Sequence, residues 1–155
     1  MSTTPRLSIR EVDPEAQKAV SGLSQYVRNG ALDEALRELV DIRASQINNC
    51  AWCLDLHVTH ARNVGVEQRR IDLVAAWQEA GTLFSQREQA ALAFTEAVTL
   101  ISKDGVPDDV WDAVTTVLDE KETVQLLMTI ATINVHNRIN VAMRTALRAE
   151  PVLPT

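Results

Sequence analysis

The two cysteines of the chain lie three positions apart and are followed by two histidines at helical spacing. Cys50 and Cys53 form a Cys-x-x-Cys pair, and His57 and His60 come one and two helical turns after Cys53. On an α-helix, where each residue turns by about 100°, these four side chains fall within an arc of about 80°. A thiolate is the reactive form of cysteine, and a helix N-terminus, a nearby histidine and this spacing all lower its pKa. The pattern predicts thiol redox chemistry, in which one cysteine captures the other after oxidation.

The same residues also offer zinc-type ligands. Cys50 and His60 would lie about 15 Å apart along a continuous helix, because each residue adds about 1.5 Å. They could not share one ion, whose bonds to sulfur and nitrogen are about 2.0–2.3 Å long. A site made of Cys50, Cys53 and His57 with an added carboxylate remains open as an alternative. The weaker fit of these ligands leads us to expect no metal and no other bound cofactor.

A purely structural role for these residues is the other alternative. Buried cysteine often behaves as a small hydrophobic residue, and His57 by itself would more often be structural than catalytic. On that interpretation the protein is a non-enzymatic helical scaffold with a vestigial thiol pair. Two thiols and an imidazole on one face favour the redox interpretation.

Composition indicates one domain and argues against two classes of partner. The chain has 155 residues, 46% of them hydrophobic, and a net charge of −6 from 15 basic and 21 acidic residues. Nonspecific nucleic-acid binding requires a basic face, and no stretch approaches the ~18 apolar residues of a membrane span. The N-terminus has no apolar signal segment, so we expect a cytoplasmic protein. In the cytoplasm thiols stay reduced unless they are catalytic or bind metal.

Helical signals dominate the chain, and no alternating run is long enough to predict a strand. Residues 1–13 are expected to form an extended N-terminal arm and residues 14–150 a single helical domain. Ser85 and Glu88 make a capping box that opens one helix, and Gly65 is suited to end another. We predict an all-α fold with helices near residues 14–28, 33–47, 50–63, 71–80, 85–102, 107–117 and 122–148.

The last predicted helix is apolar around most of its circumference. Its apolar residues include Val124, Leu126, Leu127, Met128, Ile130, Ile133, Val135, Ile139, Val141 and Met143. A domain of this size covers one broad stripe, and the rest would form a patch typical of an interface. We therefore expect a homo-oligomer. Asn137 and Arg138 in the same helix need partners if they are buried, which favours a structural role.

The segment from Glu38 to His57 resembles a motif of a known family. It reads Glu-Leu-Val-Asp-Ile-Arg-Ala-Ser-Gln-Ile-Asn-Asn-Cys-Ala-Trp-Cys-Leu-Asp-Leu-His, with the glutamate twelve residues before the first cysteine and the histidine four after the second. These spacings are similar to those of the alkylhydroperoxidase D (AhpD)-like branch of the carboxymuconolactone decarboxylase family. Similar stretches at 61–65, 75–77, 87–97 and 133–138 extend the resemblance over nearly the whole chain after Pro14.

The resemblance implies an all-helical antioxidant fold, assembled as a trimer or hexamer, that reduces hydroperoxides with its thiols. By this analogy Cys53 attacks the peroxide and Cys50 resolves the product as a disulfide, while Glu38 and His57 relay protons. An external thiol or lipoyl-type compound is the implied reductant, with a peroxiredoxin or lipoyl protein as redox partner. Decarboxylation is the least expected activity, because decarboxylase members of the family generally lack the Cys-x-x-Cys pair.

Three positions near the motif are secondary to it. Trp52 stands where the well-studied AhpD proteins have a histidine, and an indole cannot relay a proton at neutral pH. Asn49 stands where a glycine often precedes the first cysteine, and His60 extends the thiol face by one turn. These differences keep a second enzymatic interpretation open, a protein or lipoyl disulfide reductase without efficient peroxide turnover.

The residues alone leave the order of the two thiols open. Cys50 lies nearer the start of the predicted helix, where the helix dipole lowers the pKa of a thiol more strongly. Cys53 and His57 are at positions i and i+4, so their side chains are neighbours. Together with the resemblance, this proximity leads us to expect Cys53 as the nucleophile.

Overall fold

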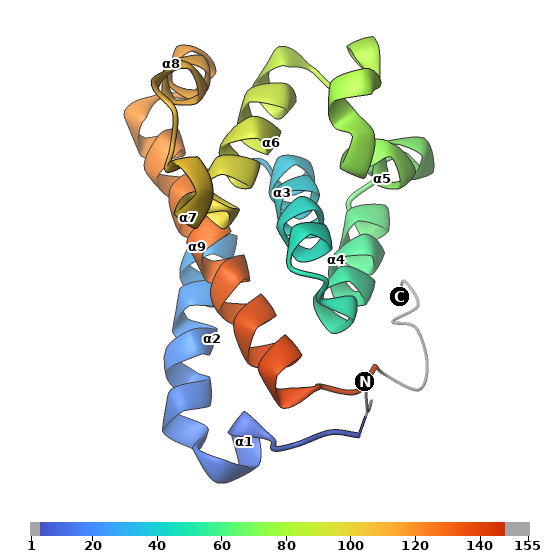
Figure 1. Cartoon of the computed structure of the whole chain (residues 1–155), viewed down its shortest axis with the longest axis vertical. Helices are drawn as coiled ribbons and strands as arrows, with labels where there is room; N and C mark the ends of the chain where they lie inside the picture. The colour runs from blue at the N-terminus through green and yellow to red at the C-terminus, as the bar shows by residue number, and fades with distance from the viewer. Residues whose placement is uncertain (1–3, 148–155) are drawn as a thin grey trace.

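The computed structural model describes residues 4–147, which form helices and connecting loops with no β-strand among them. The all-α prediction is confirmed. The α-helices are α1 (Ile9–Val12), α2 (Pro14–Arg28), α3 (Glu34–Ile47), α4 (Ala51–Asn63), α5 (Gln68–Leu73), α6 (Gln86–Thr99), α7 (Ile101–Asp104), α8 (Asp108–Val117) and α9 (Glu120–Met143), and the 3-10 segments are η1 (Val74–Glu79) and η2 (Gly81–Leu83). Figure 1 shows α9 running along the long axis, with α2 on one side and α3 and α4 on the other.

Short-range caps define where most of these helices begin. Asp13 accepts a hydrogen bond from the backbone of α2, and Asp33 does the same for α3. At the start of α6 the predicted capping box is present, because Ser85 and Glu88 each bond the other's backbone N–H. Such caps satisfy amides that lack partners inside the helix, and losing one typically costs about 1 kcal/mol. The starts of α3 and α6 were therefore readable from the sequence.

Helix α3 lies at the centre of the packing. Leu36 and Val40 pack with α6, α8 and α9 in one hydrophobic cluster. Leu39 and Ile42 pack with α4, η1 and α6 in a second cluster. Because both clusters use α3, the polar residues of this helix are drawn into the interior as well, Glu38 among them.

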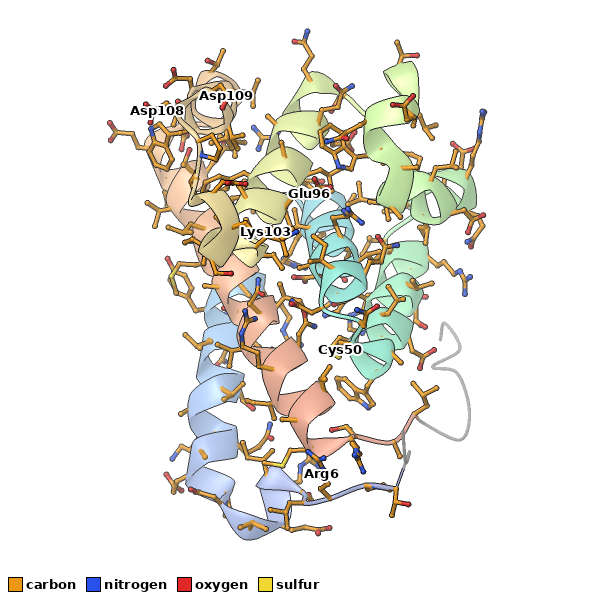
Figure 2. All side chains as sticks on the ribbon, viewed as in Figure 1. Arg6, Cys50, Glu96, Lys103, Asp108 and Asp109 are labelled. Carbon is orange, nitrogen blue, oxygen red and sulfur yellow. A yellow bond between two sulfur atoms is a disulfide. The ribbon has the colours of Figure 1, made fainter. Side chains whose placement is uncertain are left out.

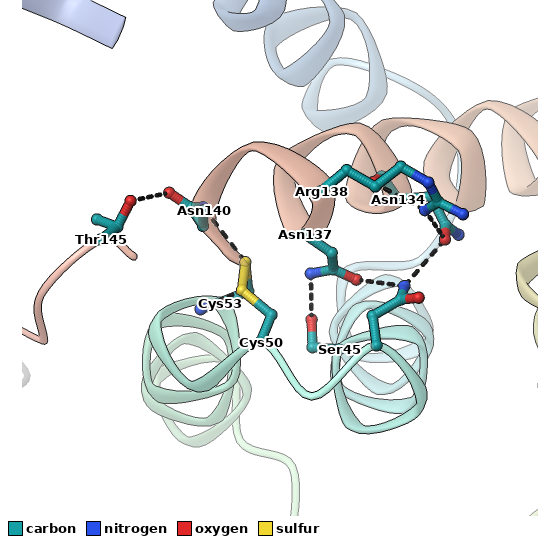
Figure 3. The surroundings of a disulfide bond; sticks show 9 residues. Ser45, Cys50, Cys53, Asn134, Asn137, Arg138, Asn140 and Thr145 are labelled. Carbon is teal, nitrogen blue, oxygen red and sulfur yellow. Dashed lines mark hydrogen bonds between the residues drawn. A yellow bond between two sulfur atoms is a disulfide. The ribbon is translucent and has the colours of Figure 1, made fainter. Parts of the chain in front are cut away.

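A cluster of polar side chains joins the end of α3 to α9 (Figure 3). Asn48 Nδ2 donates to Asn134 Oδ1 at 2.9 Å and to Asn137 Oδ1 at 2.8 Å. Asn137 Nδ2 donates to Ser45 Oγ at 3.1 Å, and Arg138 Nη1 donates to Asn134 Oδ1 at 2.6 Å. Asn137 is fully buried, so these bonds satisfy its polar atoms. The contacts support the structural role predicted for Asn137 and Arg138.

The N-terminal segment differs from the extended arm that the sequence suggests. Residues 4–8 are non-helical, but Ile9–Val12 form one helical turn, closed by the Asp13 N–H donating to the Ile9 carbonyl at 2.9 Å. Arg6 donates through its backbone N–H to the Met143 carbonyl and through Nη1 to the Ala142 carbonyl. Figure 2 shows Arg6 reaching the C-terminal end of α9. The segment is therefore held against the domain by hydrogen bonds from a distant helix.

Three predicted helices have different bounds in the structure. The helix expected at 85–102 is interrupted at Leu100, so that α6 ends at Thr99 and α7 follows from Ile101. The helix expected at 71–80 is divided into α5 and the tighter 3-10 segment η1, with Trp77 Nε1 donating to Glu96 Oε1 at 2.8 Å. Helix α9 ends at Met143 rather than near 148, because Arg144 adopts a left-handed conformation with φ 54°. Residues 148–150, the end of the predicted domain, lie outside the described residues. No helix in the described part of the chain is long and apolar enough to cross a bilayer.

We predict that Asn137→Ala lowers the free energy of unfolding by about 2–4 kcal/mol, measured by urea denaturation of the oxidised protein. The change removes two buried hydrogen bonds and leaves the Ser45 hydroxyl and part of the Asn48 amide unsatisfied. Asn63→Ala, at an exposed position of α4, is the matched control and should change stability by less than about 0.5 kcal/mol. Equal effects of the two substitutions would contradict a stabilising role for the cluster.

Candidate active site

The loop between α3 and α4 places the two cysteines. Asn49 has φ 54°, in the left-handed region that glycine and asparagine tolerate better than other residues. This requirement explains why asparagine can replace a glycine before the first cysteine. The Cys50 N–H then donates to the Ser45 carbonyl at 3.0 Å, which fixes the end of the turn.

Cys50 and Cys53 form a disulfide with their Cα atoms 5.4 Å apart. Cys50 is the N-cap of α4 rather than a residue within it, and its Sγ accepts a hydrogen bond from the Cys53 N–H at 3.3 Å. Asn140 on α9 donates through Nδ2 to Cys53 Sγ at 3.4 Å (Figure 3). Both sulfurs therefore have an N–H donor, which is an arrangement that stabilises a thiolate after reduction.

The predicted Glu38–His57 pair is formed in the structure. His57 Nδ1 lies 2.7 Å from Glu38 Oε2, across the contact between α3 and α4. Glu38 is 4% exposed, and Arg37 Nε lies 3.8 Å from its other carboxylate oxygen. Because one ring nitrogen of His57 bonds Glu38, its Nε2 is the atom left for proton exchange.

A second carboxylate, Asp41, was not identified from the sequence. Asp41 Oδ2 lies 3.4 Å from His57 Nδ1, and the side chain is buried. Burial, reinforced by Glu38, raises the pKa of Asp41 to about 7 against the opposing charges of His57 and Arg37. The signal that could have revealed it is the spacing, since residues three apart share a helix face.

The two carboxylates also act on the imidazole. Burial by itself would lower the pKa of His57, but Asp41 and Glu38 together outweigh it, so the pKa is raised above the usual value of 6.5. The two carboxylates therefore make His57 a stronger base than an exposed histidine, and Asp41 keeps its proton to a higher pH than an exposed aspartate. A group that holds a proton beside a buried thiol is suited to acid–base catalysis.

Of the two secondary residues, His60 lies beside Glu38 and His57, and Trp52 lies against the cluster that contains the cysteines. His60 Nδ1 is 4.0 Å from Glu38 Oε2, and its ring packs edge-on against His57 with centroids 5.9 Å apart. Oxygen and nitrogen atoms of Glu38, His57 and His60 lie within 4.8 Å of one another, so these three residues could hold a divalent cation. This set differs from the Cys50, Cys53 and His57 set considered from the sequence. Trp52 packs against the hydrophobic cluster formed by Ala44, Cys50, Cys53 and Ile133.

A cavity of about 730 Å³, termed here the site cavity, opens beside these residues. Helices α3 and α4 contribute Arg37, Glu38, Asp41, Trp52, Cys53 and His57 to its lining, and the rest comes mainly from the N-terminal segment, α2 and α9. Cys50 lines a separate, shallow depression of about 370 Å³ with residues of α3 and α4. Cys53 and Cys50 therefore line different cavities.

His136, from α9, adds a third histidine to the lining of the site cavity. Its Nε2 lies 2.6 Å from Ser24 Oγ. Burial, with the nearby charges of His57 and Arg28, lowers the pKa of His136. His57 and His136 are therefore shifted in opposite directions within one cavity, and His57 is the imidazole suited to donate a proton.

A helical domain with a buried Cys-x-x-Cys disulfide beside a glutamate–histidine pair has the architecture of the AhpD-like proteins. The sequence model of the carboxymuconolactone decarboxylase family matches residues 14–97, and the chain belongs to this family. The chain is 38% identical over 138 residues to the uncharacterised protein YdfG of Bacillus subtilis (strain 168), covering 89% of this chain and 93% of YdfG.

Solved structures agree with this assignment. The crystal structure of ATU0492 from Agrobacterium tumefaciens, a protein of unknown function with a suggested AhpD antioxidant defence role, is 35% identical, with a TM-score of 0.92 over 95% of this chain and 100% of that one. The AhpD core of a peroxidase-related protein from Ralstonia eutropha JMP134 is 19% identical, with a TM-score of 0.78 over 92% of this chain and 75% of that one. The second similarity concerns the fold alone.

The raised pKa values predict how stability changes with pH. Between about pH 4 and pH 7 the folded protein keeps a proton on Asp41 that the unfolded chain has lost, and His57 acts in the same direction above its usual pKa. Both groups contribute stability at low pH that is lost as the pH rises through their folded-state values. Asp41→Asn cannot titrate, so the variant should not lose this stability as the pH rises. The unfolding free energy of the variant minus that of the wild type should therefore increase by about 2–3 kcal/mol from about pH 4.5 to pH 8.

Urea denaturation at a series of pH values measures this difference. Asp55→Asn, at an exposed position of α4, is the matched control for loss of an aspartate. The same pH trend in both variants would show that the buried position of Asp41 is not its cause.

Proposed function

We propose that this protein is a thiol-dependent hydroperoxide reductase. The observation that carries the proposal is that Cys53 lines the site cavity one helical turn from His57, whose Nδ1 is bonded to Glu38. A nucleophile, a base and a group that orients the base are thus supplied by adjacent helices. The suggested antioxidant role of the Agrobacterium tumefaciens protein, which is 35% identical, supports the same class of reaction.

The first half-reaction consumes the peroxide. In the reduced protein His57 accepts the Cys53 thiol proton at Nε2, while Glu38 stabilises the imidazolium. The Cys53 thiolate attacks the terminal oxygen of ROOH, the O–O bond breaks, and the leaving alkoxide takes the proton from His57. The products are ROH and a Cys53 sulfenic acid, so the sulfur has lost two electrons and the peroxide has gained them.

The second half-reaction closes the disulfide. The Cys50 thiolate attacks the Cys53 sulfur, and the departing hydroxide combines with the Cys50 proton to form water. Two thiols and one hydroperoxide thereby give one disulfide, one alcohol and one water. An external dithiol, of a lipoyl group or a partner protein, then reduces the disulfide by exchange.

The environments of the sulfurs support this division of labour. Cys53 lines the site cavity, receives a hydrogen bond from Asn140 and lies one turn before His57. Cys50 lines the shallow depression, and its Sγ accepts a hydrogen bond from the Cys53 N–H at the N-terminus of α4. We therefore assign peroxide attack to Cys53 and resolution to Cys50.

A disulfide reductase is the second candidate function, and the depression at Cys50 favours it. The disulfide of a partner could approach Cys50 of the reduced protein from that side without entering the site cavity. The Cys50 thiolate would attack this disulfide and release one partner thiolate. Cys53, whose thiolate Asn140 and His57 stabilise, would then attack Cys50, close the Cys50–Cys53 disulfide and release the second partner thiolate. Comparing turnover of cumene hydroperoxide with turnover of oxidised lipoamide distinguishes the two functions, because a reductase would process only the second.

Thiol chemistry tests the peroxidase directly. One equivalent of cumene hydroperoxide should remove both thiols of the reduced protein, as counted with a chromogenic disulfide. Cys50→Ser should accumulate a sulfenic acid that dimedone labels at Cys53, whereas Cys53→Ser should keep its Cys50 thiol. Faster labelling of Cys50 in the second variant would reverse the assigned roles, and unchanged thiols in the wild type would contradict the peroxidase.

Assembly as a trimer or hexamer is part of the same proposal. Val124, Leu127 and Val141 on α9 remain substantially exposed, as does Ile101 of α7, and such apolar groups suit an interface between subunits. Light scattering at micromolar concentration should give about 51 kDa for three copies of the 17.1 kDa chain, or twice that. Val124→Lys should lower the mass, and a wild-type mass near 17 kDa would contradict assembly.

A further inference from the structure

The site cavity has both apolar and polar side chains in its lining. Leu7, Val20, Leu56, Ile139 and Met143 supply apolar surface from the N-terminal segment, α2, α4 and α9. Charged and polar side chains come from these elements and also from α3. A volume of about 730 Å³ lies within the range that holds small organic ligands. The lining therefore suits a molecule with an apolar body and a polar group.

Arg37 brings an unsatisfied cation to this cavity. It is 5% exposed, and its Nη1 has no hydrogen-bond partner among the described residues. Its two ion-pair contacts are long, 3.5 Å from Nη2 to Glu34 Oε1 and 3.8 Å from Nε to Glu38 Oε1. Charge-assisted hydrogen bonds are typically about 2.7–2.9 Å long. The guanidinium is therefore buried without the close oxygen partners that such a group requires.

Thr132, from α9, brings a second unsatisfied group to the same cavity. Its hydroxyl is buried and has no hydrogen-bond partner among the described residues. Thr123 and Thr129 of the same helix behave differently, because each donates to the carbonyl four residues earlier. Of the three such buried atoms in the described chain, Arg37 Nη1 and Thr132 Oγ1 belong to residues lining the site cavity.

The charges that line the cavity favour an anion. Four arginines line it, Arg6, Arg10, Arg28 and Arg37, against three carboxylates, Glu11, Glu38 and Asp41. Glu38 is already paired with His57, and burial raises the pKa of Asp41 to about 7, which reduces its negative charge. A carboxylate offers two oxygens to a guanidinium and can also accept a hydrogen bond from a hydroxyl.

From these contacts we infer that the site cavity binds the carboxylate of an amphiphilic acid through Arg37 and Thr132, with the apolar chain along α2, α9 and the N-terminal segment. The substrate class is then an organic hydroperoxide that carries a carboxylate, such as a fatty-acid hydroperoxide; this part of the inference rests on the proposed peroxidase function. The reaction at Cys53 is unchanged, and the carboxylate serves to orient the peroxide.

Ligand binding to the oxidised protein tests the carboxylate site without any turnover. Octanoate and octan-1-ol have the same chain length and are titrated by isothermal calorimetry. Octanoate should bind at least about tenfold more tightly, because hydrogen bonds to a charged group are worth about 1.5–3 kcal/mol. Arg37→Gln should weaken octanoate binding by about tenfold or more, and the near-isosteric Thr132→Val by about threefold, with octan-1-ol little affected.

Matched variants control for indirect effects. Thr123→Val removes a buried hydroxyl of α9 outside the cavity lining, and Arg62→Gln removes an arginine of α4 outside it. Both should bind octanoate like the wild type. Thr132→Val keeps the test decisive if Arg37→Gln does not fold, which circular dichroism reports. Equal affinity for octanoate and octan-1-ol, or equal losses in the control variants, would overturn the inference.

Activity measurements separate this inference from the proposed function. The hydroperoxide of linoleic acid should have a higher kcat/KM than the hydroperoxide of its methyl ester. Thr132→Val should reduce this preference for the free acid by raising the KM of the acid. Octanoate binding without turnover of any hydroperoxide would support the ligand site and contradict the peroxidase. Turnover of cumene hydroperoxide with no preference for octanoate or for the free acid would support the peroxidase and contradict the carboxylate site.

Discussion

The hydrogen bond between His57 and Glu38 is the contact on which the site depends. It crosses the α3–α4 interface at 2.7 Å, and Glu38 is almost fully buried. A buried carboxylate is costly unless it is paired and hydrogen-bonded, so the bond supports the position of both helices. It also fixes which nitrogen of His57 is available, and it holds the ring one turn beyond Cys53.

Helix α3 can hold polar groups in the interior because its apolar residues stabilise the domain on both sides. Leu39 and Leu36 belong to different hydrophobic clusters, while Glu38 and Asp41 lie between elements that these clusters hold together. Burying two carboxylates near one imidazole raises the proton affinity of His57 and of Asp41. Such an electrostatic cost, tolerated because the surrounding core is well packed, is typical of functional sites.

The disulfide divides two environments. Cys53 lines the larger cavity, which has apolar walls and charged residues, whereas Cys50 lines a shallow depression near the loop that precedes α4. The left-handed turn at Asn49 makes this division possible, because it places Cys50 at the N-cap and Cys53 within the helix.

The sequence by itself determined the helical class, the starts of helices such as the one at Ser85, and the Glu38–Cys-x-x-Cys–His57 motif. Caps act between residues three apart, and the motif is recognised from spacing, so neither requires knowledge of the tertiary fold. The surroundings of Asp41, Asn140 and Arg37 were decided only by packing. Burial alters a pKa or leaves a hydrogen-bond donor without a partner only after distant helices have excluded water from it. For the same reason the end of α9, which the N-terminal segment contacts, was not readable from local signals.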